Sequence, residues 1–236
     1  MNEYDVKSKG ARITLIAGHY GSGKSEISVN YALFIAVKLG EEAGITLFDL
    51  DIVNPYFRSR ECRDLLEQRS IRVVSSAEDF PDVDLPYMPP ELTSLFQDNS
   101  RIGVMDIGGD PAGARVLARY GVELNKVMQA GEAEIFCVIN ANRPMTKKHE
   151  AAVSYVKKIR DTAGIPITGL INNTHFFAET EPEDIYRGVE LTESVSDELG
   201  IPIAFHAVER SLAEKLDKDI GPILPMDIFL KKPWEK

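Results

Sequence analysis

The sequence is poor in cysteine and has no long hydrophobic run. Its two cysteines, Cys62 and Cys137, lie far apart and form no C-x-x-C pair, which excludes a disulfide scaffold, a zinc knuckle and a thiol redox motif. Two buried, reduced thiols favour a cytoplasmic location. No apolar run approaches the ~20 residues of a membrane span, and residues 1–10 are polar. We therefore expect a cytoplasmic protein without a membrane partner.

Positive charge is also scarce. The chain has 27 Lys and Arg against 37 Asp and Glu, a net charge of -10, which opposes a large contact with a phosphate backbone. The locally basic stretch is residues 143–160, and helical spacing spreads most of its charges around an outer face, as in a solvated helix. DNA binding through this stretch is a minor alternative, so nucleic acid is not an expected partner.

What the sequence does contain is a series of short apolar runs rich in β-branched residues, separated by helix-length segments. Runs that are apolar at successive positions indicate strands covered on both faces, as in a parallel sheet. We predict one doubly wound α/β domain over residues 1–236, with a mainly parallel sheet of about seven strands and helices on both faces. The predicted strands are 13–17, 45–50, 71–74, 102–107, 135–139, 167–171 and 201–204. The predicted helices are 24–39, 55–68, 90–96, 112–119, 146–163, 182–199 and 208–216.

Residues 18–25, GHYGSGKS, fit the phosphate-binding pattern G-x-x-x-x-G-K-[ST] between the first strand and the first helix. Small residues let successive backbone N–H groups surround phosphate oxygens, and the helix N-terminus adds its positive dipole end. Lys24 would reach the β and γ phosphates from an exposed loop, and Ser25 would ligate Mg²⁺. The alternative is a glycine turn that only joins strand to helix. The nucleotide-binding residues expected here are Gly18, His19, Tyr20, Gly21, Ser22, Gly23, Lys24, Ser25 and Glu26.

Two further predicted strands end in carboxylates. Asp49 and Asp51 lie at the end of strand 45–50, and Asp106 lies at the end of strand 102–107, shortly before Gly109. In an open parallel sheet this edge is where ligands bind. Carboxylate oxygens suit Mg²⁺, and a flexible glycine can donate its N–H to a γ-phosphate. Asp51 has an alternative role, in which it caps the turn through residues 54–55.

These segments resemble the P-loop NTPases of the MinD, ParA and nitrogenase iron protein class, with the CobQ-type synthetases as relatives. The resemblance covers roughly residues 12–222 and implies ATP and Mg²⁺ as cofactors. It implies that Ser25, Asp49 and Asp106 lie at the metal, with Asp106 as the Walker B carboxylate, and that Asp51 positions the attacking water. Lys24, Asp51 and Asp106 are then the expected catalytic residues. Further residues implied are Asp110 in the second switch, and Asn172 and Asn173 in base recognition.

Two positions depart from that class. His19 stands where the usual loop has a lysine that crosses a dimer interface, so activation in the standard sandwich dimer is not predicted. Gly113 stands where the iron protein has a cluster-binding cysteine, so a bridging iron–sulfur cluster is not expected.

The nucleobase is indicated by residues 172–175, Asn-Asn-Thr-His. Guanine is usually read by N-K-x-D, whose aspartate accepts from the base, and no carboxylate stands at the fourth position here. An asparagine amide can pair with adenine, so ATP is preferred over GTP. Residues 140–144, Asn-Ala-Asn-Arg-Pro, would flank the base or a switch, or form a capped turn.

The leading hypothesis is a Mg²⁺-dependent ATPase that acts as a switch, read by a protein partner or by a second copy of the chain. The alternative is an ATP-dependent ligase or kinase acting on a small anionic substrate near Tyr56, Arg58 and Arg60. A third hypothesis is a module that holds nucleotide without turnover. Residues 75–90 form either a functional loop or an irregular surface crossing, and residues 226–236 are expected to dock on the body of the protein.

Overall fold

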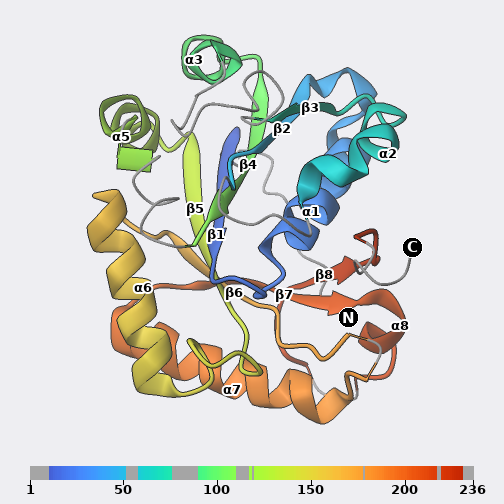
Figure 1. Ribbon diagram of the computed structural model, residues 1–236, viewed down its shortest axis with the longest axis vertical. Coiled ribbons are helices and arrows are strands. Elements are labelled where there is room, and N and C mark those ends of the chain that lie inside the picture. Colours follow the sequence, from blue (N-terminus) through green and yellow to red (C-terminus); the bar gives the residue numbers. More distant parts are fainter. Residues whose placement is uncertain are drawn as a thin grey trace, which may run out of the picture.

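Eight parallel strands form one sheet, in the order β3-β2-β4-β1-β5-β6-β7-β8 (Figure 1). The computed structural model describes residues 11–51, 58–75, 90–109, 117–118, 120–177, 179–216 and 219–230. The strands are β1 Ile13–Gly18, β2 Ile45–Asp49, β3 Arg72–Ser75, β4 Ile102–Gly108, β5 Ala133–Ile139, β6 Gly169–Asn172, β7 Ile203–Glu209 and β8 Ile223–Met226. The doubly wound α/β fold is thus confirmed, with an eighth strand that was not predicted. β8 contains Pro225, and it lies at the sheet edge, where a missing N–H is tolerated.

Helices fill the connections. They are α1 Lys24–Leu39, α2 Arg63–Glu67, α3 Pro90–Gln97, α5 Gly121–Gln129, α6 His149–Ala163, α7 Pro182–Leu199 and α8 Arg210–Ala213, with short 3-10 turns η1 Glu41–Ala43 and η2 Ser59–Cys62. The bounds of α1 and α7 match the prediction. The predicted helix 112–119 lies mostly outside the described residues, and α5 was missed because Tyr120 at its N-terminus supplies no side-chain cap. In the described part of the chain, no helix is both long and apolar enough to span a bilayer.

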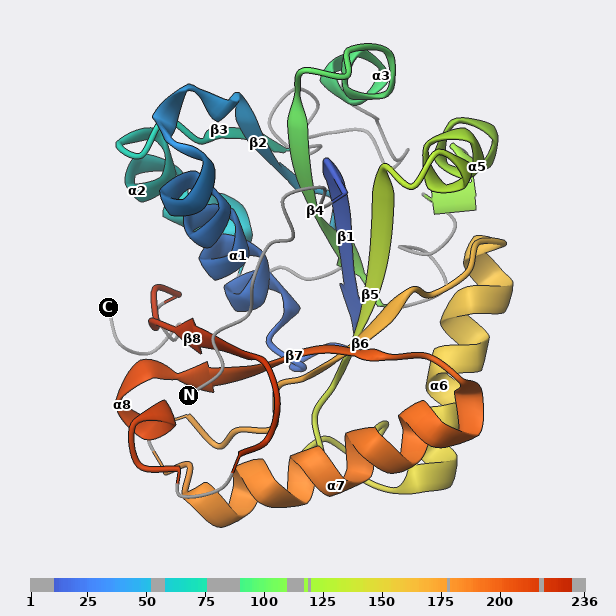
Figure 2. The ribbon, with the colours of Figure 1, turned by 180° about the vertical axis from the view of Figure 1, so that it is seen from behind.

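The sheet separates two hydrophobic layers. One packs α3, α5, α6 and α7 against the strands, and the other packs α1 and α2 together with the segment after β8. Figures 1 and 2 show α3, α5 and α6 on one side of the sheet and α1 and α2 on the other. Because both faces are covered, the strands are buried at successive residues, as the continuous apolar runs indicated.

Three aromatic rings join α1 to strands β5 and β7. Tyr31 stacks on Phe205 with ring centroids 5.9 Å apart, and Phe136 meets both rings edge to face. Phe205 is fully buried. Aromatic pairs of this geometry add stability beyond the area that they bury.

Phe205→Ala is therefore expected to lower the free energy of unfolding by ~3–5 kcal/mol, because it leaves a cavity between α1 and the sheet. Urea unfolding followed by circular dichroism measures this change. Val37→Ala, on the exposed side of α1, is the matched control and should change stability little. Equal losses in the two variants would contradict the assignment of this core.

Candidate functional site

The sequence-predicted segments meet at one edge of the sheet, because the carboxyl ends of parallel strands lie together. The loop of residues 18–23 follows β1, and Asp49 ends β2. Asp106 is the register partner of Asp49 on β4. Residues 140–143 follow β5, and Asn172 ends β6.

The loop after β1 is held in a conformation that requires glycine. Gly21 and Gly23 have φ angles of 75° and 86°, in the left-handed region. The N–H of Ser22 donates to the carbonyl of His19 at 2.9 Å, which closes the turn before α1. A Cβ atom on Gly23 would collide with the side-chain amide of Asn173. The loop is therefore shaped both by its own glycines and by a neighbour from β6.

Two side chains from the loops that follow β5 and β6 hold the backbone carbonyls of this loop. Asn173 Nδ2 donates to the carbonyl of Ser22 at 2.7 Å, and Arg143 Nε donates to the carbonyl of Gly21 at 2.7 Å. The resemblance implied that Asn173 reads a base; the structure places its amide on the loop backbone. Arg143 was noted in the sequence only as part of a basic stretch and a strand end, and its contact with the loop was not foreseen.

Asn172 lies deeper. It is 1% exposed, its Oδ1 accepts from the backbone N–H and hydroxyl of Thr174, and its Nδ2 lies 3.3 Å from Nδ1 of His206. Its amide therefore has partners inside the protein, and its role in base recognition stays a prediction.

Lys24 is buried, which contradicts the expectation of an exposed lysine. It begins α1 with a relative exposure of 3%, and its Nζ lies 2.5 Å from Oδ2 of Asp51. Asp49, Asp51 and Asp106 are also buried around it. The backbone N–H of Leu50 donates to the carbonyl of Asp106, and the chain then turns so that Asp51 reaches Lys24.

This cluster shifts the pKa of its members. Burial and the neighbouring charge of Asp106 raise the pKa of Asp49 to about 7, although Arg60 opposes the shift. Burial raises the pKa of Asp106, while Lys24 favours its charged form. Burial alone would lower the pKa of Lys24, but Asp106, Asp51 and Asp49 outweigh it and raise that pKa above its usual value. One ammonium thus neutralises much of a buried acidic cluster.

Several buried polar atoms around the loop have no well-formed hydrogen bond within the described residues. They are His19 Nδ1, Ser22 Oγ, Asp49 Oδ1, Ser59 Oγ and both carboxylate oxygens of Asp106. The hydroxyls of Ser25 and Ser59 are nevertheless close enough to favour the charged form of Asp106. Buried polar groups of native proteins are rarely left without partners, so such a concentration points to a bound ligand or ion. Ser59, on η2, was not singled out in the sequence, where nothing marks it.

The described carboxylates do not form a ready-made metal cage. No group of three or more His, Cys, Asp or Glu side chains in these residues is arranged to hold a metal ion. Magnesium usually takes only one or two protein carboxylates together with water and ligand oxygens, so this arrangement fits Mg²⁺ bound with a phosphate.

A cavity of about 300 Å³ opens beside the loop. Polar groups from the loop, with Arg143 and His175, line one part of it. Apolar side chains from β7, α8, β8 and the segment after β8, with one from α7 and one from the loop after β6, line the rest. The apolar lining includes Phe177, Ile185, Val208, Leu212, Met226, Ile228 and Leu230. These apolar residues were missed because they are scattered along the sequence and only the sheet order brings them together.

Glu26 fastens the segment after β8 to α1. Its carboxylate accepts from the N–H groups of Phe229 and Leu230, at 2.8 and 3.1 Å. Asn30, one turn later, exchanges two hydrogen bonds with the backbone of Asp227. Glu26 lines the cavity, but its hydrogen bonds bind the protein's own chain, and residues 226–230 dock on the body as expected.

Gly109 is packed where no side chain fits. A Cβ there would collide with the carbonyl of Gly18, and the hydroxyl of Tyr155 on α6 donates to the Gly109 carbonyl at 2.9 Å. Other predicted features, Tyr56, Asp110, Gly113 and most of the loop 75–90, lie outside the described residues.

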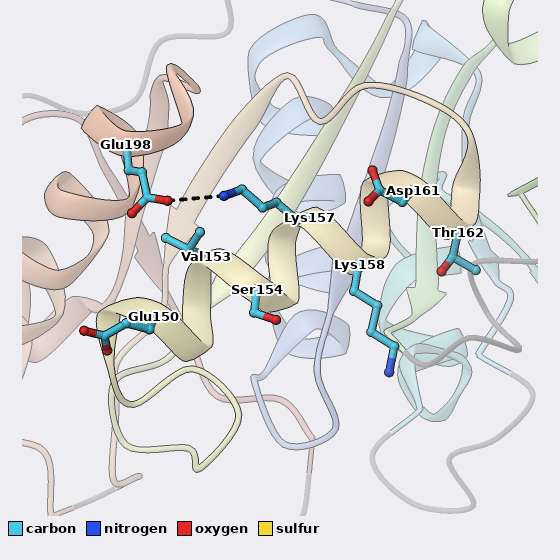
Figure 3. Close-up of a pocket in the computed structure, with 8 residues that line it drawn as sticks. All are labelled: Glu150, Val153, Ser154, Lys157, Lys158, Asp161, Thr162 and Glu198. Carbon is cyan, nitrogen blue, oxygen red and sulfur yellow. Dashed lines mark hydrogen bonds and ion pairs between the residues drawn. The ribbon is translucent and has the colours of Figure 1, made fainter.

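The basic stretch on α6 is partly neutralised. Residues of this helix line a surface pocket of about 680 Å³. Figure 3 shows these residues and the ion pair of Lys157 with Glu198, whose N–O distance is 3.2 Å. Arg160 pairs with Asp161 at 3.0 Å, and His149 also contacts Glu198. These pairs reduce the positive charge available for a nucleic acid.

Comparison with known proteins gave no matching family model and no matching curated protein. Similar solved structures include chloroplast FtsY from Physcomitrella patens, with TM-score 0.57 and 15% identity over 87% of this chain and 61% of that chain. FtsY from Thermotoga maritima has TM-score 0.52 and 17% identity over 88% and 65%. The signal recognition particle receptor FtsY from Elizabethkingia anophelis, in complex with GDP, has TM-score 0.51 and 14% identity over 84% and 57%.

The chain spans about three fifths of the length of these structures. At such low identity the similarity shows the fold alone, which is the α/β fold of P-loop NTPases. It does not distinguish the MinD and ParA class from other P-loop NTPases.

Removing the buried ammonium is expected to destabilise the protein. Lys24→Ala should lower the free energy of unfolding by ~3 kcal/mol or more, because it leaves Asp51 buried without its cation. The double variant Lys24→Met, Asp51→Asn should recover much of this loss. Urea unfolding near neutral pH, without nucleotide, measures the difference, with Arg160→Ala at an exposed ion pair as control. A Lys24→Ala protein of wild-type stability would contradict the buried pair.

His206 predicts a pH effect on stability. Burial lowers the pKa of His206 to about 4, from 6.5. Between these two pH values the unfolded chain binds a proton at His206 that the folded protein does not bind. The stability associated with His206 is therefore complete above pH 6.5 and is lost as the pH falls toward 4. Over this range the wild type should lose up to ~3 kcal/mol relative to His206→Gln. Unfolding curves at several pH values test this; a constant difference would refute it.

Proposed function

We propose that this chain is a Mg²⁺-dependent nucleoside triphosphatase that works as a nucleotide-driven switch. The observation that carries the proposal is the group of buried polar atoms around the glycine loop that have no well-formed hydrogen bond within the described residues, at the edge of a P-loop NTPase-like fold. A phosphate chain with its metal would satisfy such groups. We propose that residues 1–236 form one domain in the cytoplasm; the two cysteines, both free and buried, support that location.

The proposed chemistry is mainly positioning and charge neutralisation. The N–H groups of residues 18–25 and the Lys24 ammonium would bind the phosphates. Ser25 and Asp106 would hold Mg²⁺ with Asp49 beside them, and the metal would neutralise phosphate charge. Asp51 would position the attacking water. Its ion pair with Lys24 supports a switch: a phosphate that recruits Lys24 would weaken the pair and change the position of Asp51.

ATP is the proposed nucleotide. The apolar part of the cavity fits a base, and the two glutamates that line it, Glu26 and Glu209, already accept hydrogen bonds from within the protein. The lack of a carboxylate among residues 172–175 supports the same preference. Since one similar structure was solved with GDP, GTP is the competitor to test.

A protein partner or a second copy of the chain would read the switch, as in the MinD and ParA class. Tyr20, at the tip of the loop, is 59% exposed and is a contact point for such a partner. His19, in the position of the crossing lysine, lies edge-on to Tyr155 of the same chain, with ring centroids 6.0 Å apart.

The ligase or kinase alternative gains no support from Arg60. Its guanidinium donates to Ser75 at 2.7 Å and lies 3.9 Å from the Asp49 carboxylate, so its charge is engaged inside the protein. We therefore put forward no second function.

Asp51→Asn is expected to retain ATP binding and to hydrolyse ATP ~10²-fold more slowly or worse, because it loses the carboxylate that positions the attacking water. It also loses the ion pair with Lys24, which a bound phosphate would itself weaken. Asp106→Asn should also lose Mg²⁺-dependent binding. His19→Ala should cost less than Asp51→Asn. Calorimetric titration with ATP and GTP, with and without Mg²⁺, and phosphate release measure these effects.

If Asp51→Asn hydrolyses ATP at the wild-type rate, Asp51 does not position the attacking water. Equal or tighter binding of GTP would overturn the choice of ATP. A protein that binds neither nucleotide would overturn the function itself.

A further inference from the structure

Arg143 is a cation beside the glycine loop without an acidic partner in the described residues. Within the described residues, the side chain of Arg143 makes one hydrogen bond, from its Nε to the carbonyl of Gly21, and no ion pair. Its two terminal nitrogens, which carry four of the five N–H donors, make no hydrogen bond to these residues. Lys24, by contrast, is paired with Asp51.

Arg143 is half-buried and lines the same cavity as Gly21, Lys24 and Ser25. The positive charge of Arg143 also acts on two histidines at the site. After burial, which is the largest cause, Arg143 helps to lower the pKa of His19 and the pKa of His175, the latter to about 4. Both imidazoles are therefore uncharged at neutral pH and do not replace Arg143 as a cation here.

The loop that carries Arg143 is built rigidly after β5. The hydroxyl of Thr146 donates to the carbonyl of Asn140 at 2.7 Å, and the backbone N–H of Arg143 donates to the same carbonyl at 3.1 Å. The N–H of Ala141 donates to Thr174 at 3.0 Å, which joins this loop to the one after β6. A side chain on such a support is held in place before any ligand arrives.

We propose that Arg143 is a second phosphate-binding cation, which acts with Lys24 on the polyphosphate chain of the bound nucleotide. This rests on the proposed function. A half-buried guanidinium whose outer donors and charge have no partner among the described residues attracts an anion, and its planar fork suits phosphate oxygens. The hydrogen bond to Gly21 fixes one edge of the guanidinium and leaves its outer donors for the ligand.

The competing explanation is that Arg143 only ties two loops together, and a glutamine substitution separates the two roles. The Nε2 atom of glutamine lies as many bonds from the backbone as the Nε atom of arginine. Arg143→Gln can therefore keep the bond to Gly21 while it loses the charge and the outer donors. Arg143→Ala loses both, and Arg143→Lys keeps the charge. Lys147→Gln, at an exposed position on the same segment, is the control for net charge.

The experiment is calorimetric titration of each full-length variant with inorganic tripolyphosphate, ATP and adenosine, after thermal unfolding has shown that the variant is folded. Arg143→Gln should bind tripolyphosphate and ATP about 10- to 100-fold more weakly, the range for hydrogen bonds to a charged group. Its affinity for adenosine should not change. The affinity of Arg143→Lys for tripolyphosphate and ATP should lie between those of the wild type and Arg143→Gln. Lys147→Gln should bind with wild-type affinity.

Wild-type affinity in Arg143→Gln, with a loss only in Arg143→Ala, would overturn the proposal in favour of a tie between loops. An equal loss for adenosine and tripolyphosphate would also overturn it. A wild type that binds tripolyphosphate but no nucleotide, with loss in Arg143→Gln, would support the role of Arg143 and refute the proposed function. A wild type that binds none of the three ligands would refute both.

Discussion

The desolvation of one ammonium group among three carboxylates is the constraint on which this site depends. Lys24 is buried with Asp49, Asp51 and Asp106, and it loses its hydration only because Asp51 replaces it at 2.5 Å. Buried charges require partners, because removing one partner leaves the other charges buried without compensation. The glycine loop, the start of α1 and the ends of β2 and β4 are therefore held in one arrangement by electrostatics as well as by packing.

The loop itself depends on neighbours that lie more than a hundred residues away. Its carbonyls are held by Asn173 from the end of β6 and by Arg143 from the loop after β5. Thr174 connects these two neighbours to each other. These two bonds fix the orientation of the loop carbonyls, and with it that of the N–H groups that a phosphate-binding loop turns toward its ligand. In the proposed function, the two neighbouring loops would thus support phosphate binding without belonging to the motif.

The last described segment forms part of the lining of the cavity beside the loop. Glu26, in the first turn of α1, binds the backbone of residues 229–230, and Asn30 binds that of Asp227. Since α1 begins at Lys24, the glycine loop and the segment after β8 are both attached to the first turns of the same helix.

The sequence by itself determined the parallel α/β fold, because continuous apolar runs report burial on both faces. It also determined the glycine loop and the acidic strand ends, because those motifs are local. It missed α5, which has no capping side chain, and β8, whose proline is tolerated only at a sheet edge. Only the tertiary structure decided that Lys24 is buried against Asp51, that Asn173 and Arg143 hold the loop, and that Asn172 bonds within the protein. Each of these involves a contact between distant segments, which for Asn172 is the contact with His206, and the order of the strands, which no local pattern encodes, brings them together.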